Sequence, residues 1–295
     1  MTGKQIRPAQ VAGTFYPGNP VELKTQLENL FKEAQKLKIE SSQQIKLLIV
    51  PHAGYIYSGS VAAAGFNQLN PQTFQRVVLL GVSHQSWFEG AALDDHEAWE
   101  TPLGSVLVDQ AWAEKIANPT AKIQFSGLVH LAEHSLEVQL PFLQKKLAQF
   151  KIVPILLGGT DDQLLTTLAR KLQAQLDDQT LIVISSDLSH YPNYEIAQQV
   201  DQATIKAILT GDPNQWKKTV QEQTALDYPN LDTVACGAAA IKTGLYLGQL
   251  LGGQWHLIQY ANSGDVSGDY GRVVGYASLG FTLATRKNGS ESSQT

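Results

Sequence analysis

The chain has 295 residues, of which 43% are hydrophobic and 17% charged, and its net charge at pH 7 is −5. This composition indicates a globular protein with a sizeable core, and the lack of any run of basic residues argues against nucleic acid as a partner. Apolar stretches such as VVLLGV are too short to cross a membrane, and the start MTGKQIRPAQVAG lacks the apolar region of a secretory signal.

The first half of the chain predicts helices that alternate with buried strands. Apolar residues at helical spacing predict a helix over 20–38. A strand of branched apolar residues then ends at Val50, and a helix of small residues follows over 60–69. A second buried strand is expected over about 77–82.

The second half continues the same alternation. The segment 133–149 is amphipathic and predicts a helix kinked at Pro141. The further elements are a strand at KIVPILLGG, a helix over 161–176, a strand over 180–186, helices over about 194–209, 213–222 and 232–250, and two or three strands over 255–283. We therefore expect one α/β domain over 1–284, with a central, mostly parallel (mixed) sheet, helices on both faces, and a disordered polar tail over 285–295.

Three apolar runs end on, or close to, a histidine. They are KLLIVPH to His52, RVVLLGVSH to His84 and LIVISSDLSH to His190. In an open parallel sheet the chemistry collects just beyond the carboxyl ends of the strands. Three histidines delivered there by three strands predict a functional site, and a metal site is the leading form of that hypothesis.

His52 and His84 are the first pair of candidates. His52 precedes Ala53 and Gly54, which allow a tight turn that leaves the imidazole at the edge of the sheet. His84 ends the next strand, and two strands of the same direction can bring both rings to within reach of one metal ion, about 2.0–2.1 Å from each nitrogen. The alternative is that His52 only caps its strand with an ordinary hydrogen bond.

Asp187 and His190 follow the third strand, three positions apart. If this turn is helical, the two side chains share a face. His190 suits a general acid or base, because its unperturbed pKa lies near neutrality, and Asp187 could orient it or take part in holding a metal. The alternative is that Asp187 merely caps the helix that follows.

Glu133 and His134 open the predicted helix of AEHSLEVQLPF and are candidates to line the site in catalytic roles. A helix dipole favours an acidic residue in that turn regardless of function, which is the alternative for Glu133. Cys236, the only cysteine, begins a helix of small residues whose field would push it toward thiolate. It is either a metal ligand or nucleophile, or a core residue, and the lack of a second cysteine makes the cytoplasm the expected location.

The sequence lacks the common motifs of nucleotide-binding proteins and of serine hydrolases. The chain contains no GxGxxG, GxxxxGK[ST] or GxSxG sequence. The glycine-rich stretch 260–272 lacks a strand-to-helix context, so we expect a loop over the site.

Several segments together resemble one family. VPHAGYIYSG, LGVSH, EHSLEVQLPFL, SSDLSHY, the Cys236-Gly237 pair and YANSGD occur in this order, preceded by AGTFYPGNP. Together they closely resemble the Memo family (mediator of cell motility), also called AmmeMemoRadiSam system protein B. The resemblance covers roughly 7–283.

The resemblance implies a fold like that of the class III extradiol ring-cleaving dioxygenases, with a metal cleft. It places metal ligands on His52, His84 and Cys236, and places Asp187 and His190 beside them. The related dioxygenases use two histidines and a glutamate on Fe(II), so a cysteine at the third position departs from that pattern. Thiolate favours iron, with copper or zinc as alternatives.

Three functions are compatible with these residues. The first is an iron- or copper-dependent oxidoreductase-like protein, in which His190 moves protons. The second is a metal-dependent hydrolase at the same Cys/His/His site, with Glu133 or His190 as the base. The third is a non-catalytic protein that binds a peptide or handles a metal. We expect a small-molecule or peptide ligand in the cleft, and the family name suggests a functional link to radical-SAM and AMMECR-type proteins.

Overall fold

The computed structural model describes residues 5–34 and 44–283. Its centre is an eight-stranded mixed sheet in the order β10-β11-β2-β9-β3-β8-β4-β7. The strands are β1 (Ile6–Arg7), β2 (Ile45–Val50), β3 (Arg76–Val82), β4 (Ala91–Leu93), β5 (Ala98–Thr101), β6 (Gly104–Leu107), β7 (Ile123–Phe125), β8 (Lys151–Leu157), β9 (Thr180–Ser185), β10 (Gly253–Asn262) and β11 (Gly275–Leu283). Within this sheet β2, β9, β3 and β8 are mutually parallel, which confirms the predicted fold class.

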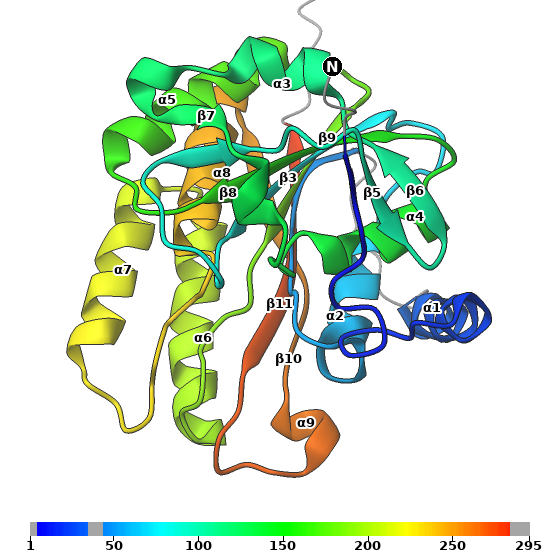
Figure 1. The fold of residues 1–295 in the computed structure, drawn as a ribbon. Helices are drawn as coiled ribbons and strands as arrows, with labels where there is room; N and C mark the ends of the chain where they lie inside the picture. The colour runs from blue at the N-terminus through cyan, green and yellow to red at the C-terminus, as the bar shows by residue number, and fades with distance from the viewer. Residues whose placement is uncertain (1–4, 35–43, 284–295) are drawn as a thin grey trace, which may run out of the picture.

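Helices cover both faces of the sheet. They are α1 (Pro20–Ala34), α2 (Tyr55–Asn67), α3 (Gln110–Ile116), α4 (Leu140–Lys146), α5 (Asp162–Gln175), α6 (Tyr194–Leu209), α7 (Pro213–Ala225), α8 (Ala238–Leu251) and α9 (Gly264–Ser267), with short 3-10 turns η1 (Pro119–Ala121), η2 (Gly127–His130) and η3 (Glu137–Gln139). Figure 1 shows α1 and α2 on one side of the sheet and α5 to α8 on the other.

The central strands are buried on both faces, and this explains their unbroken apolar sequences. In β2, Leu47 and Ile49 join the core on the α5 and α8 side, whereas Leu48 and Val50 join the core with α1 and α2. Successive side chains of a strand point to opposite faces, so a strand between two helical layers needs apolar residues at every position.

Some predicted elements differ from the structure. The helix expected over 60–69 begins earlier, at Tyr55, directly after Gly54. The expected helix over 133–149 is wrong, because the chain forms η3 and then α4, which begins at Leu140. Pro141 lies in the first turn of α4, where its missing N–H costs nothing, rather than at a kink.

A smaller sheet, in the order β1-β5-β6, has no counterpart in the predicted elements. Its strands are only two to four residues long, too short to show a clear alternation in the sequence. The end of the predicted first helix, 35–38, and the predicted tail, 285–295, lie outside the described residues.

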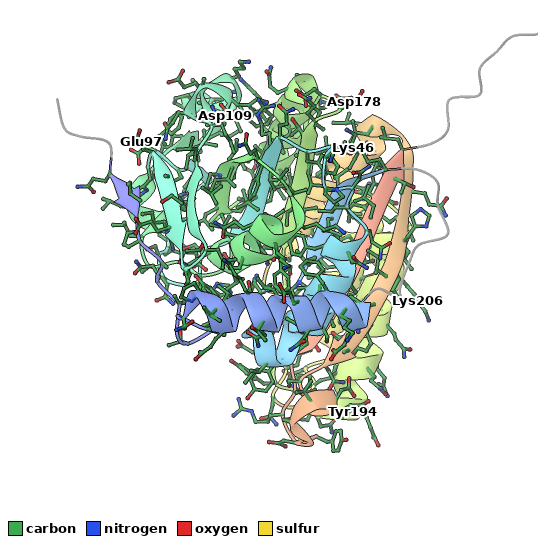
Figure 2. The ribbon with its side chains drawn as sticks, turned by 90° about the vertical axis from the view of Figure 1, so that its right-hand side faces the viewer. Lys46, Glu97, Asp109, Asp178, Tyr194 and Lys206 are labelled. Carbon is green, nitrogen blue, oxygen red and sulfur yellow. The ribbon has the colours of Figure 1, made fainter. Side chains whose placement is uncertain are left out.

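The two ends of the sheet carry different features. Figure 2 shows Lys46, Asp109 and Asp178 at one end of the molecule and Tyr194, which begins α6, at the opposite end. Lys46 and Asp178 lie at the amino ends of β2 and β9, so the carboxyl ends of these strands face the other way. Over the parts of the chain that the structure describes, no helix is long and apolar enough to cross a membrane.

Candidate metal centre

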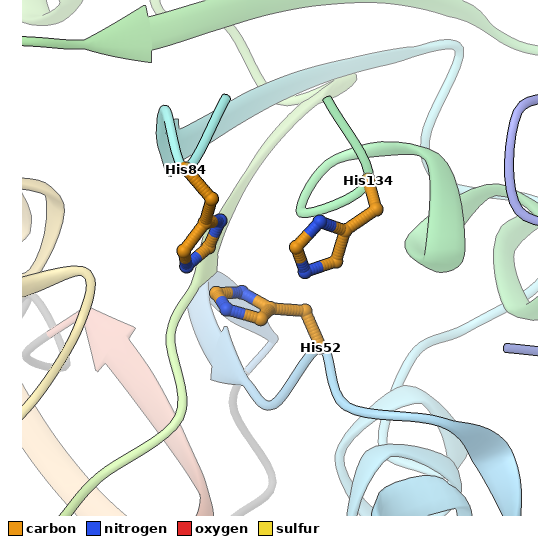
Figure 3. A group of neighbouring side chains, drawn as sticks. All are labelled: His52, His84 and His134. Carbon is orange, nitrogen blue, oxygen red and sulfur yellow. The ribbon is translucent and has the colours of Figure 1, made fainter. Parts of the chain in front are cut away.

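Three histidines from separate segments converge beyond the sheet. His52 follows β2, His84 follows β3, and His134 lies in the segment between η2 and η3. One ring nitrogen from each lies within 4.8 Å of the others, and Figure 3 shows the three rings facing a common point. We call these residues the histidine cluster. Strand β9 lies between β2 and β3 in the sheet, so two of the rings come from strands that flank it.

Glu133 orients two rings of the histidine cluster. Its Oε1 lies 3.0 Å from Nδ1 of His84 and 3.3 Å from Nδ1 of His134. An ionised carboxylate only accepts hydrogen bonds, so Nδ1 of His84 donates and its Nε2 presents a lone pair. The same contact favours Nε2 of His134 as the free nitrogen. Carboxylate–histidine pairs of this kind orient histidine ligands of metals.

The carboxylate of Glu133 is saturated with donors. It also accepts from the backbone N–H groups of His84 at 2.5 Å, His134 at 2.9 Å and Ser135 at 2.8 Å. Burial would raise the pKa of Glu133, but the hydrogen bonds from His84 and from these backbone groups outweigh it and hold the pKa well below its usual range.

A buried ion pair fastens the segment that carries Glu133 and His134. Arg7 donates to Oε2 of Glu137 at 2.6 Å, to the carbonyl oxygen of His130 at 2.7 Å, and to that of Glu133 at 2.5 Å. Glu137 in turn accepts from the N-terminal segment, from Gln10 N, Val11 N and the hydroxyl group of Tyr16. The planar guanidinium can hold several carbonyl groups at once, so Arg7 fixes the backbone of 130–137.

His52 is the most buried ring of the histidine cluster, with 2% of its surface exposed. Its Nδ1 lies 2.9 Å from Oγ of Ser185, and its Nε2 lies 3.2 Å from Sγ of Cys236. Burial, with the neighbouring ring of His84, holds the pKa of His52 well below its usual value, so the ring is neutral at pH 7. The side chains of His84 and His134 are 26% and 16% exposed, so solvent reaches the cluster from their side.

Asp187 and His190 are not arranged as a helical turn. Residue 190 is in extended backbone that bridges to Thr233 and Val274, so the expected i, i+3 face does not form. Oδ1 of Asp187 accepts from the backbone N–H of His52 at 2.7 Å. Asp187 thus contacts the His52 segment, and burial raises its pKa to about 7 despite backbone hydrogen bonds from His52 and Ala53.

His190 has a free ring nitrogen. Its Nε2 is buried and has no hydrogen-bond partner among the described residues. Burial, with the nearby ring of His84, lowers the pKa of His190 from near neutrality to about 4, so the imidazole is neutral at pH 7. A neutral imidazole with an unpaired nitrogen can accept or pass on a proton.

Cys236 lies beside the histidine cluster and contacts only one of its rings, His52. The helix that follows begins at Ala238, so Cys236 precedes its first turn. Burial and the charge of Asp187 raise the pKa of the thiol. The expected shift toward thiolate by the helix field is therefore wrong for the metal-free protein.

Two features of the site were absent from the sequence predictions. The ring of Phe15, from the N-terminal segment, packs on His134 with centroids 4.7 Å apart. Ser185 contacts His52 from the end of β9. Neither is part of a recognisable metal or catalytic motif, although Phe15 lies in the AGTFY segment of the resemblance and Ser185 is the first residue of its SSDLSHY segment.

Two other places in the molecule are less suited to a metal or substrate. Asp94, Asp95 and His96 also lie close together. The carboxylate of Asp94 is, however, engaged by Nδ1 of His96 and Nε1 of Trp99. A groove of about 1040 Å³, lined by the starts of β3 and β8 and by the β5–β6 turn, includes none of the histidine cluster.

Comparisons with known proteins identify the family. The model of the Memo family, described as Memo-like protein, matches residues 7–280. The chain belongs to the Memo family. A Memo relative described as a MEMO1 family protein, from Nitrosopumilus maritimus, is 34% identical over 281 residues, which are 94% of this chain and 99% of the relative. Another from Aquifex aeolicus is 35% identical over 285 residues, with the same coverage of 94% and 99%.

The Memo match spans the whole candidate metal centre, from Arg7 to Cys236. The expected Memo resemblance is thereby confirmed. Among solved structures, that of an uncharacterized protein from Escherichia coli K12 is 14% identical and aligns with 80% of this chain and 99% of that chain. Its TM-score of 0.47 is too low to relate the two folds.

Proposed function

We propose that this Memo protein holds a redox-active metal ion, iron or copper, at the histidine cluster and acts as an oxidoreductase. The observation that carries the proposal is the convergence of His52, His84 and His134, with one ring nitrogen of each within 4.8 Å of the others. Imidazole nitrogen suits iron, copper and zinc, and a neighbouring sulfur atom adds preference for iron or copper over harder cations.

The donor set fits a metal ion. Nδ1 of His84 and of His134 faces the carboxylate of Glu133, and Nδ1 of His52 faces Ser185. This leaves Nε2 of each ring for the metal, with Cys236 available next to His52. An iron or copper ion bound there would supply one-electron chemistry.

The protein's own side chains would orient the ligands and transfer protons. Glu133 orients His84 and His134, because its oxygens already accept hydrogen bonds from four donor groups and are not free to remove a proton. His190 is the group that moves protons, through its unpaired Nε2. Asp187 holds the backbone of His52 rather than the ring of His190.

A hydrolytic function is the second candidate, and a specific observation favours it. Three histidine nitrogens with no carboxylate among them are a donor set that catalytic zinc uses to activate water. His190 would then be the base.

Metal analysis with spectroscopy on anaerobically purified protein separates the two candidates. We expect near-stoichiometric iron or copper, with an electron paramagnetic resonance signal that changes on oxidation and reduction. Zinc at full occupancy, with no redox-active metal, would support the hydrolase instead. No metal at a near-stoichiometric level would contradict both.

A further inference from the structure

We propose that the hydroxyl group of Ser185 sets the tautomer of His52, with the proton on Nδ1 and the lone pair on Nε2. This makes Ser185 a positioning residue of the candidate metal centre. Its role in metal binding rests on the proposed function. Ser185 is the last residue of β9, the strand between those that lead to His52 and His84, and it is completely buried.

The hydroxyl group has three partners, and two of them have fixed roles. Oγ of Ser185 lies 2.6 Å from the carbonyl oxygen of Ser135, which can only accept a hydrogen bond. It lies 2.9 Å from Nε2 of Gln139, which can only donate. The third partner is Nδ1 of His52, also at 2.9 Å.

Counting protons decides the direction of the third bond. A serine hydroxyl group has one proton to donate and two lone pairs to accept with. If that proton pointed at His52, two oxygen atoms, those of Ser185 and Ser135, would face each other at 2.6 Å without a hydrogen between them. The proton therefore goes to the carbonyl oxygen of Ser135, and Nδ1 of His52 donates to Ser185.

The amide of Gln139 makes the arrangement unambiguous. Its Nε2 also donates to the carbonyl oxygen of Pro51 at 2.9 Å. An amide held between two acceptors must present nitrogen to both, so it cannot be turned to offer its oxygen to Ser185.

The tautomer also determines the hydrogen bond at Nε2, on the other side of the His52 ring. Because Nε2 of His52 carries no proton, it can accept the S–H of Cys236, whose Sγ lies 3.2 Å away and 3.8 Å from the other acceptor, the carbonyl oxygen of Asp187. The lone pair of Nε2 thus faces the thiol, on the side of the ring that would bind a metal ion.

The same hydroxyl group also joins two parts of the site. Ser135 follows His134 directly, so the bond from Ser185 to its carbonyl oxygen fixes the His134 segment relative to the His52 ring. Loss of the hydroxyl group would release both ligands at once.

Nitrogen NMR of the imidazole rings in metal-free protein at pH 7 tests the proposal, with His52 assigned from a His52→Gln variant. We expect wild-type His52 to be protonated on Nδ1. In Ser185→Ala, we expect it to shift toward the form protonated on Nε2, and the affinity for Fe(II) to fall by about 10–100-fold. Ser278→Ala is the matched control, because its hydroxyl group is equally buried and donates to the carbonyl oxygen of Val61, which is not part of the site.

Two results would overturn the proposal. Wild-type His52 protonated on Nε2 would do so without any variant, even if Ser185→Ala fails to fold. An unchanged Nδ1 tautomer in folded Ser185→Ala would do so as well. Because the tautomer is measured without metal, failure of the protein to bind iron would contradict the proposed function and leave this measurement valid.

Discussion

Arg7 and Glu137 form a fully buried ion pair of 2.6 Å across 130 positions of sequence. The pair joins the N-terminal segment to the segment that carries Glu133 and His134. The guanidinium also lies over the ring of Trp99, 4.1 Å from its centroid. The position of His134 therefore depends on a residue near the start of the chain, far from it in the sequence.

Replacing Arg7 with methionine should destabilise the protein strongly. The substitution leaves the carboxylate of Glu137 buried without its partner, and breaking a buried ion pair in this way costs about 3–5 kcal/mol. Urea unfolding measures the change. Lys145→Gln, which removes an exposed ion pair with Glu28, is the control and should have little effect. Equal effects of the two substitutions would show that the buried pair has no special role.

Because of Asp201, the free energy of unfolding should fall as pH rises from about 4 toward 7. Burial raises its pKa to about 7, although the N–H of Ser189 and the hydroxyl group of Tyr260 donate to it. The unfolded chain releases this proton near pH 4, so between these values the folded state binds more protons and loses stability with rising pH. The total effect on the free energy of unfolding is on the order of 4 kcal/mol.

Asp201→Asn isolates that contribution. The amide can still accept from Ser189 and has no charge to bury, so the variant should gain stability over the wild type at pH 8 and match it more closely at pH 4. Urea unfolding at both values gives the comparison. The comparison also distinguishes the effect of Asp201 from that of Asp187, whose pKa is raised by burial as well. A difference between variant and wild type that does not change with pH would contradict the assignment.

Glu133→Gln should weaken metal binding while the fold is retained. The amide cannot accept from all the donors that surround the carboxylate, so His84 and His134 lose their common anchor. Loss of such a partner typically lowers metal affinity by about 10–100-fold. Competition with a chelator of known affinity measures it, and Glu89→Gln, at an exposed glutamate paired with Lys122, is the control. Equal affinity of both variants would argue that Glu133 does not orient the ligands.

Metal binding should release about one proton if Cys236 becomes a ligand. The thiol is protonated in the metal-free protein, since burial raises its pKa, and only the thiolate coordinates a metal. Calorimetric titration in two buffers of different ionisation enthalpy counts the proton, and Cys236→Ser should remove it. Binding without proton release in the wild type would leave Cys236 out of the ligand set.

The sequence predicts the parts of this site that depend on repeated local patterns. His52 and His84 are found because apolar runs mark buried strands, and parallel strands bring their carboxyl ends together. His134 and Glu133 are predicted as part of the site but on the wrong element, because Arg7, which binds the carbonyl oxygens of His130 and Glu133, is distant from them in the sequence. Arg7 and Ser185 leave no local pattern, since their roles arise only from contacts between segments distant in the sequence.

Titration of metal-free protein with Fe(II) under anaerobic conditions decides whether the histidine cluster is a metal site, as we claim. The wild type should bind one equivalent, and His84→Ala should lose that binding. His256→Ala, which removes a partly buried histidine hydrogen-bonded to Thr282 on β11, should bind as the wild type does. Binding of one equivalent by His84→Ala with unchanged affinity would contradict the claim.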